Sequence, residues 1–500
     1  MLNTPCKRIK IYSSSVFRLL FGAIVSLIVG CSAPQPMSID PSVLTPENWS
    51  ANEALSENLA DESVSVTSDV FSRHKTEEQL ANYFGLHTPE LLTLVQEGLA
   101  HNPALAAAQE KVMQSELALR ATRADRFPLI SLATDMTRPE SNESTFSINA
   151  NVSWSIDLWG ELSAAQRQAQ LEYASAIANF KQERMTLIAN TYRQWFQLQE
   201  SQLLVTLYQE RTQSVQGDLE VMESGYLNGL YEALDLYLAR NDANAQIAKL
   251  SEQEQTLKET QRGLEQLLGR YPKAMIGADE ALPLTPMLSQ VPLPSSIIQQ
   301  RPDLQASWLS LLAADQALAV AHRARFPRLS LTGRYGGSSD VLSDLVNRSN
   351  LAWSLGASLA ATLFDAGQLE ANQSLKASQR RGLEQSYLND LYTAFAEVEN
   401  SLSAESSLRQ QYALYREAQA NAVHAESLSF ERYQRGLEDY NTVLEAQRRS
   451  LDAQTTIIGL RRSLLQNRVD LMVALGGALD PQFAVNDPPE NTLLEEKLQP

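Results

Sequence analysis

Two stretches of the chain alternate apolar and polar residues, the pattern of a β-strand with one apolar and one wet face. Residues 146–158 carry Phe, Ile, Ala, Val, Trp, Ile and Leu on even positions, with mainly Ser, Asn and Asp between them. Residues 351–363 repeat the alternation. Each stretch follows a shorter one, residues 129–135 and 329–335, that can serve as its partner. Because successive side chains of a strand point to opposite faces, we predict four strands in two hairpins.

Two long spans without proline, residues 140–271 and 328–480, are rich in residues that favour helices. They predict helices over residues 161–226 and 368–433. Each of these helices would be about 100 Å long at about 1.5 Å per residue. Helices of this length rarely belong to a compact domain.

The first long helix carries a heptad pattern. Its apolar residues recur at every seventh position, as in Leu171, Ala178, Met185 and Tyr192. Such a pattern predicts packing against neighbouring helices as a coiled coil. The alternative, an amphipathic helix on a globular core, does not need to run this far.

Each long helix is expected to turn at a glycine and return as a shorter helix, over residues 231–268 and 438–475. Two further segments, residues 103–126 and 302–325, begin with a proline, which suits the first turn of a helix. A returning helix alone is too short to accompany its partner. We therefore expect these segments to stack end to end with the returning helices, so that each long helix has a full-length partner.

The two halves of the chain repeat one unit. Asn102-Pro103 returns as Arg301-Pro302, and Arg126-Phe127-Pro128 returns as Arg325-Phe326-Pro327, both 199 positions later. Further on the displacement is 207, as between Gly229 and Gly436. The second copy therefore carries a longer loop in its strand region. A period of this size indicates a duplication, because solenoid repeats are only about 20–50 residues long.

Charge and composition narrow the class of protein. The chain has 500 residues, 44% of them apolar, and a formal net charge of -18. This acidic balance, with no basic stripe, argues against a nucleic-acid partner, which requires clustered Lys and Arg. The five histidines are isolated, and no nucleophile or phosphate-loop motif occurs. We therefore expect no enzyme activity, no cofactor and no metal site.

The N-terminus has the layout of a signal peptide. Residues 1–30 contain no acidic residue and place four basic residues before the apolar stretch 19–29. That stretch is shorter than the roughly 20 residues of a membrane-spanning helix. It ends in Ile28-Val29-Gly30-Cys31, which resembles the lipobox of bacterial lipoproteins. Cys6 lies in the segment to be removed, so we expect Cys31 to be the lipidated first residue of the mature chain.

The strands suggest that the chain also crosses a membrane. A soluble sheet could show the same alternation, but transmembrane strands need about 9–11 residues and favour aromatic residues near the interfaces. Four strands cannot close a barrel, and open sheet edges are not tolerated in lipid. The membrane interpretation therefore requires an oligomer.

Taken together, these features resemble the TolC-like outer-membrane factor family, in particular its lipoprotein branch. The resemblance covers residues 89–477. Besides Cys31, it is carried by Arg301-Pro302-Asp303, Ala324-Arg325-Phe326-Pro327, Trp154-Ser155-Ile156-Asp157-Leu158-Trp159-Gly160, Leu363-Phe364-Asp365-Ala366-Gly367 and Tyr433-Gln434-Arg435-Gly436.

The resemblance implies a mainly α fold with a small β part. Three identical chains would build a twelve-stranded barrel continued by a twelve-helix periplasmic tunnel, anchored by outer-membrane lipid. On this basis we divide the chain into a signal peptide (1–30), a lipidated leader (31–88), two repeats (89–285 and 286–480) and a tail (481–500).

The function that the resemblance implies is passive transport. The trimer would carry drugs or other small molecules outward from a periplasmic adaptor protein and an inner-membrane transporter of the resistance-nodulation-division type. A channel for type I protein secretion shares the fold and remains an alternative. A periplasmic coiled-coil lipoprotein is a second alternative, but it would leave both strand hairpins unexplained.

The candidate functional residues lie at the two helical turns. In the resembled family these tips close the tunnel and meet the adaptor. Glu438 matches the position where members of the resembled family carry an acid at the tunnel aperture, and Asp439 is adjacent to it. We expect both to form the gate, because threefold symmetry would turn each into a ring of carboxylates. The alternative is an ordinary solvated acidic turn. Adaptor contacts are assigned to Tyr226, Gly229, Tyr433, Arg435 and Gly436, with glycine allowing positive φ in each turn.

Overall fold

The computed structural model describes residue 49 and residues 89–138, 144–278, 282–285 and 300–477. The signal peptide, Cys31 and the tail 481–500 lie outside the described residues, as does the leader except for Trp49. The division between the two repeats at 285/286 stays a prediction, because residues 286–299 are not described either.

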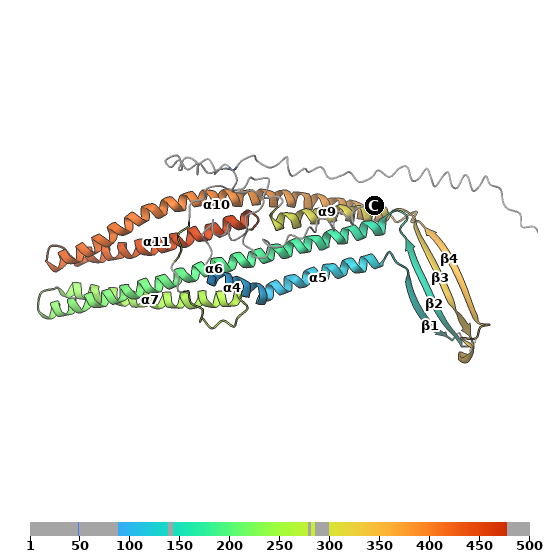
Figure 1. Ribbon diagram of the computed structural model, residues 1–500, viewed down its shortest axis with the longest axis horizontal. Helices are drawn as coiled ribbons and strands as arrows, with labels where there is room; N and C mark the ends of the chain where they lie inside the picture. The colour runs from blue at the N-terminus through green and yellow to red at the C-terminus, as the bar shows by residue number, and fades with distance from the viewer. Residues whose placement is uncertain (1–48, 50–88, 139–143, 279–281, 286–299, 478–500) are drawn as a thin grey trace, which may run out of the picture.

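Two long helical hairpins lie side by side, with a sheet at one end and the helical turns at the other (Figure 1). The long helices are α6 (Glu161–Leu227) and α10 (Gln368–Gln434), each of 67 residues. They return as α7 (Ala233–Leu267) and α11 (Tyr440–Ala474). The long helices end within one residue of the sequence prediction. The returning helices start two residues later, because the residues before them, Glu232 and Asp439, have an extended backbone.

Shorter helices extend the returning ones, as predicted. They are α5 (Pro103–Ala124) and α9 (Pro302–Arg323). Asn102 Nδ2 donates to the carbonyl of Leu267 at 2.9 Å, and Arg301 Nη1 donates to the carbonyl of Ala474 at 3.2 Å. The last turn of each returning helix thus accepts a hydrogen bond from the side chain of the residue just before α5 or α9. Helix α4 (Pro89–His101), which packs against α6, was not predicted.

The four strands form one antiparallel sheet in the order β1-β2-β3-β4. They are β1 (Leu129–Thr137), β2 (Thr145–Ile156), β3 (Arg328–Ser339) and β4 (Leu351–Ala360). The two predicted hairpins are confirmed, and β2 and β3 additionally pair with each other along their length, with Trp154 opposite Leu331. Within one chain, β1 and β4 therefore remain the edges of the sheet.

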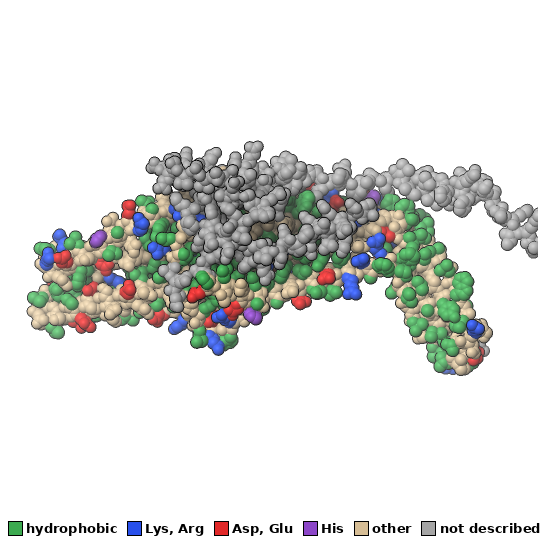
Figure 2. Space-filling model, viewed as in Figure 1, with side chains coloured by type: hydrophobic (Ala, Val, Ile, Leu, Met, Phe, Trp, Pro, Cys, Tyr) green, Lys and Arg blue, Asp and Glu red, His purple; other side chains and the backbone are tan. Residues whose placement is uncertain are grey.

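The sheet exposes large apolar side chains. Leu132, Trp353 and Leu355 are each more than two-thirds exposed, and apolar atoms cover much of the sheet in Figure 2. A surface of this kind marks contact with lipid or with another protein. Across the described parts of the chain, none of the helices combines the length and the apolar character needed to span a bilayer.

The repeated motif makes the same contact in both halves where the strands meet the helices. Arg126 Nη1 donates to Gln166 Oε1 at 2.7 Å, and Arg325 Nη1 donates to Gln373 Oε1 at 3.0 Å. Each arginine thereby connects the segment before a strand to the first turns of the long helix that follows the hairpin. The two halves thus repeat not only a sequence motif but also the hydrogen bond that it forms.

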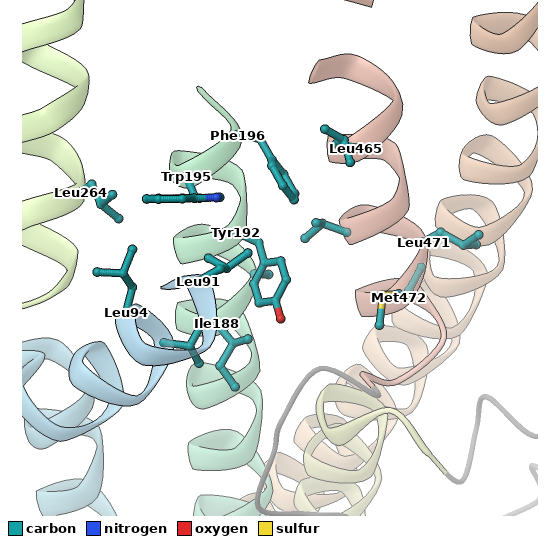
Figure 3. Close-up of a cluster of buried hydrophobic side chains, with 14 of the residues drawn as sticks. Leu91, Leu94, Ile188, Tyr192, Trp195, Phe196, Leu264, Leu465, Leu471 and Met472 are labelled. Atoms are coloured by element: carbon teal, nitrogen blue, oxygen red, sulfur yellow. The ribbon is translucent and has the colours of Figure 1, made fainter. Parts of the chain in front are cut away.

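The main hydrophobic core lies near the middle of α6 and α10, where α7 and α11 end, and Figure 3 shows part of it. Leu91 of α4, Trp195 of α6, Leu264 of α7 and Met472 of α11 all belong to it and are buried. The later heptad positions of α6, Ala178, Met185 and Tyr192, are buried as the pattern predicts. Trp49 joins the same core, with its ring 6.0 Å from that of Phe395.

Candidate functional site at the hairpin tips

Both helical turns are closed by a glycine in the left-handed region. Gly229 has φ 71° and Gly436 has φ 69°, so the predicted positive φ is confirmed at both positions. Leu230 N donates to the carbonyl of Gly225 at 2.9 Å, and Leu437 N donates to that of Arg432 at 3.0 Å. These bonds satisfy carbonyls that the end of a helix leaves without a partner.

Three tyrosines next to the turns form an aromatic contact between the two hairpins. The ring of Tyr433 stacks on that of Tyr231 at 5.3 Å and lies 5.2 Å from that of Tyr440. Tyr433 and Tyr440 are buried, together with Met222, in a small core formed by all four helices. The sequence-based assignment placed Tyr433 on an adaptor-contacting surface, whereas its ring is turned into the contact between the hairpins.

A hydrogen bond accompanies the aromatic contact. Tyr433 Oη donates to Asp235 Oδ2 at 3.1 Å, from the end of α10 to the start of α7. Burial, together with this bond and the negative charge of Asp235, raises the pKa of Tyr433. The phenol therefore keeps its proton at physiological pH and remains the donor.

Gly225 allows the tyrosines to assemble. A Cβ atom at this position would lie 2.1 Å from Cδ2 of Tyr231, closer than any real side chain can approach. Sequence analysis missed both Gly225 and Asp235. The available signal for Gly225 was a glycine inside a long helix, one turn before Gly229.

The two acids assigned to the gate have partners within the chain. Asp439 caps α11, because its Oδ1 accepts from Thr442 N at 2.9 Å. Glu438 Oε2 lies 3.3 Å from Arg432 Nη2, and Glu438 Oε1 accepts from the hydroxyl of Thr442 at 3.2 Å. Both side chains lie at the second tip, as predicted. Their arrangement around a threefold axis stays a prediction, because it involves more than one chain.

The two tips present different surfaces. The first exposes apolar residues, with Leu227 83% and Leu230 75% exposed, and Tyr226 lies beside them. The second carries ion pairs between Arg432 and Glu438 and between Arg435 and Glu431. The charged side chains stand out at the end of α10 and α11 in Figure 2. A Cβ atom added at Gly229 or Gly436 would meet no side chain or non-adjacent backbone of the described residues within 4 Å.

A polar cluster lies next to the tyrosines, farther from the turns, between all four helices. Arg211 Nη1 of α6 is 2.8 Å from Glu426 Oε1 of α10, and its Nη2 is 3.8 Å from Asp242 Oδ2 of α7. Gln447 Nε2 of α11 donates to Asp218 Oδ2 of α6 at 3.0 Å. This second cross-hairpin contact was not predicted, because its members are far apart in sequence. No group of three or more His, Cys, Asp or Glu suited to a metal ion occurs among the described residues.

Comparison with known proteins places the chain among outer-membrane proteins. The family model for outer membrane efflux proteins matches residues 94–270 and 293–477. The chain belongs to the outer membrane efflux protein family. The resemblance inferred from the motifs is thereby confirmed.

Two relatives illustrate this family. The antibiotic efflux pump outer membrane protein ArpC of Pseudomonas putida is 30% identical over 409 residues, covering 78% of this chain and 84% of ArpC. The probable outer membrane lipoprotein SilC of Salmonella typhimurium is 25% identical over 478 residues, covering 92% and 98%. Among solved structures, the Campylobacter jejuni CmeC outer membrane channel matches with a TM-score of 0.79 at 20% identity, over 94% of this chain and 98% of CmeC. That structure supports the fold alone.

The family gives the chain its general role. It is the outer-membrane channel component of an efflux pump, located in the bacterial outer membrane. Channels of this family are passive homotrimers that work with a periplasmic adaptor and an inner-membrane transporter. The mainly helical fold with a small sheet agrees with the predicted class.

Proposed function

We propose that this chain forms a conduit for small molecules that is gated at its hairpin tips. The observation that carries the proposal is the hydrogen bond from Tyr433 to Asp235, which ties the two hairpins together at the end remote from the sheet. In a trimer, the hairpins of three chains would surround the entrance to the tunnel. Moving the second hairpin away from the first would break this bond and widen the entrance.

The chemistry of the tips supports an adaptor with two kinds of contact. The first tip offers exposed apolar side chains, Leu227 and Leu230 among them, that favour burial against an apolar partner surface. The second tip offers Arg435 and Gly436 beside acidic residues, which suits polar contacts and hydrogen bonds. We propose that the adaptor engages both tips, and that the transporter behind it is of the resistance-nodulation-division type.

Lipidation at Cys31 belongs to the same proposal. The sequence before Cys31 has the signal layout, and the relative SilC is described as a probable outer membrane lipoprotein. The sheet supplies a membrane attachment of its own, so the lipid acts as an additional tether. Cys31→Ser behind an ordinary cleavable signal should still yield some trimers. Complete loss of trimers would show that assembly depends on the lipid.

Deleting the gene tests the proposal against type I secretion. The deletion strain should become several-fold more sensitive to small toxic compounds, and the intact gene should restore resistance. The adaptor should be recovered with the channel after chemical cross-linking in cells. Unchanged sensitivity, combined with loss of a secreted protein, would favour the secretion channel.

A further inference from the structure

The polar cluster behind the tips holds more negative than positive groups. The single guanidinium of Arg211 is 9% exposed and faces three carboxylates, those of Asp218, Asp242 and Glu426. From α11 the cluster receives the neutral side chains of Gln447 and Tyr440. Burial raises the pKa of Tyr440, and the nearby charges of Asp218 and Asp242 raise it further. The cluster therefore contains one buried cation and three half-buried carboxylates.

Gln447 carries an unused hydrogen-bond acceptor in the same place. Its side chain is 4% exposed, and its Nε2 donates to Asp218 Oδ2. Among the described residues, Gln447 Oε1 has no hydrogen-bond partner. A buried acceptor left without a donor is costly. An ionised Asp218 has no proton to offer, whereas a neutral carboxyl can both accept from and donate to a facing carboxamide.

The surroundings of Asp218 favour its neutral form. Burial is the main cause that raises the pKa of Asp218, and the charges of Glu426 and Asp242 raise it further. The hydrogen bond from Gln447 and the charge of Arg211 act in the opposite direction without cancelling the rise. Asp218 thus keeps its proton to a higher pH than an exposed aspartate does.

We propose that Asp218 is a proton-binding site that controls how firmly the two hairpins of one chain are held together. The bound proton removes one negative charge from the cluster and supplies the donor that Gln447 Oε1 lacks. Loss of the proton leaves three carboxylates against Arg211 and weakens the link between α6 and α11. This regulation rests on the proposed gate at the tips.

The raised pKa of Asp218 determines how the contact between the hairpins depends on pH. A group whose pKa is raised in the associated hairpins stabilises them below its ordinary pKa, which is 3.8 for Asp. That stabilisation is lost as the pH rises through the raised value. The tips should therefore be held most firmly in an acidic medium and should loosen as the medium becomes neutral.

Spin labels on the two tips can measure this change. Labels at positions 227 and 437, where the native leucines are exposed, report the separation of the hairpins in the intact trimer. As the pH is raised from an acidic to a neutral medium, the distance distribution should broaden towards larger values, and the mean conductance in planar bilayers should rise several-fold. Asp218→Asn, which mimics the neutral carboxyl, should stay in the acidic state at every pH.

A matched control removes the same charge from the same helix. Glu220 is exposed on α6, outside the cluster, and Glu220→Gln should keep the pH profile of the unmodified channel. A second variant, Gln447→Glu, replaces the neutral partner of Asp218 by an acid. It should move the midpoint of the profile to higher pH, by about one unit or more, because like charges disfavour ionisation. It also keeps the test decisive if Asp218→Asn fails to form SDS-resistant trimers.

The outcomes separate this inference from the gate on which it rests. If Tyr433→Phe opens the channel but Asp218→Asn keeps the unmodified pH profile, the proton-binding role is wrong and the gate stands. If Tyr433→Phe leaves conductance unchanged at every pH, the gate is wrong, and the label distances alone decide whether Asp218 controls the hairpins. A pH-independent distance in the unmodified protein would overturn the inference.

Discussion

Tyr433 Oη lies 3.1 Å from Asp235 Oδ2, so that one hydrogen bond connects the last turn of α10 to the first turn of α7. The bond is formed by a neutral donor and a carboxylate in a partly buried place. Bonds of this type contribute about 1.5–3 kcal/mol. This bond adds to the aromatic stacking and the small core between the two hairpins, and it is weak enough to break when the hairpins separate.

Tyr433→Phe should make the channel easier to open. The variant keeps the stack on Tyr231 and removes only the hydroxyl, so the bond to Asp235 is lost without a cavity. We expect a higher mean conductance in planar bilayers, by several-fold. Tyr226→Phe, at an exposed tyrosine of the first tip, is the matched control and should behave as the unmodified channel.

Substitutions at Glu438 and Asp439 can test the gate in a way that separates the loss of charge from the loss of helix stability. Replacing both by Ala should raise single-channel conductance, but Asp439→Ala also removes the cap of α11, at about 1 kcal/mol. Asp439→Asn retains a capping oxygen. The pair Glu438→Gln and Asp439→Asn should therefore reduce cation preference while helix stability is preserved. Unchanged conductance and ion selectivity would leave both acids as parts of an ordinary turn.

Small and large substitutions at Gly229 and Gly436 can distinguish an effect on adaptor binding from an effect on folding. Among the described residues, the Cβ of alanine meets no non-adjacent atom within 4 Å at either position, so we expect its effect to be backbone strain of about 1–2 kcal/mol. Arginine or tryptophan adds charge or bulk to the outer surface of the tip. We expect alanine variants to retain most efflux, and the larger variants to lose it while SDS-resistant trimers persist. Normal drug resistance in the larger variants would argue against adaptor contact here.

The pair Arg468 and Glu405 should govern stability in acid. Arg468 Nη2 is 2.8 Å from Glu405 Oε1, and both side chains are buried. Burial alone would raise the pKa of Glu405, but the guanidiniums of Arg468 and Arg409 hold it below the ordinary value of 4.5. The stabilisation is thus present above that value and is lost as the pH falls through the lowered pKa.

Arg468→Met leaves the Glu405 carboxylate buried without its main partner. The expected loss of stability is about 3–5 kcal/mol. Thermal unfolding of the detergent-solubilised trimer at several pH values would measure it. Arg448→Met, which removes an exposed arginine paired with Glu445, serves as the control and should change the unfolding temperature little.

The sequence predicts the long elements well and the contacts between them poorly. Helices α6 and α10 follow from absent proline and heptad spacing, because both signals lie within one element. The pairing of β2 with β3 joins residues more than 170 positions apart, such as Trp154 and Leu331, and alternation within a strand says nothing about it. Helix α4 was missed because its boundary with α5 is only the single residue Asn102.

The tip network shows the same limit. Glycines at 229 and 436 could be placed in left-handed turns from local chemistry alone. Tyr433, however, belongs to a motif of the second tip, and its burial depends on Tyr231 and Asp235 of the first hairpin. The partners of Arg211, Asp242 and Glu426, likewise come from α7 and α10 and cannot be identified from the sequence of α6.

The sheet has a genetic consequence. Because β1 and β4 each have a single hydrogen-bonded neighbour within the chain, every copy depends on another copy at both of its outer strands. A copy damaged along β1 or β4 would join two sound copies and spoil the assembly that contains all three. Alleles altered in these strands should thus be dominant over the normal allele, whereas alleles that prevent the chain from reaching the membrane should be recessive.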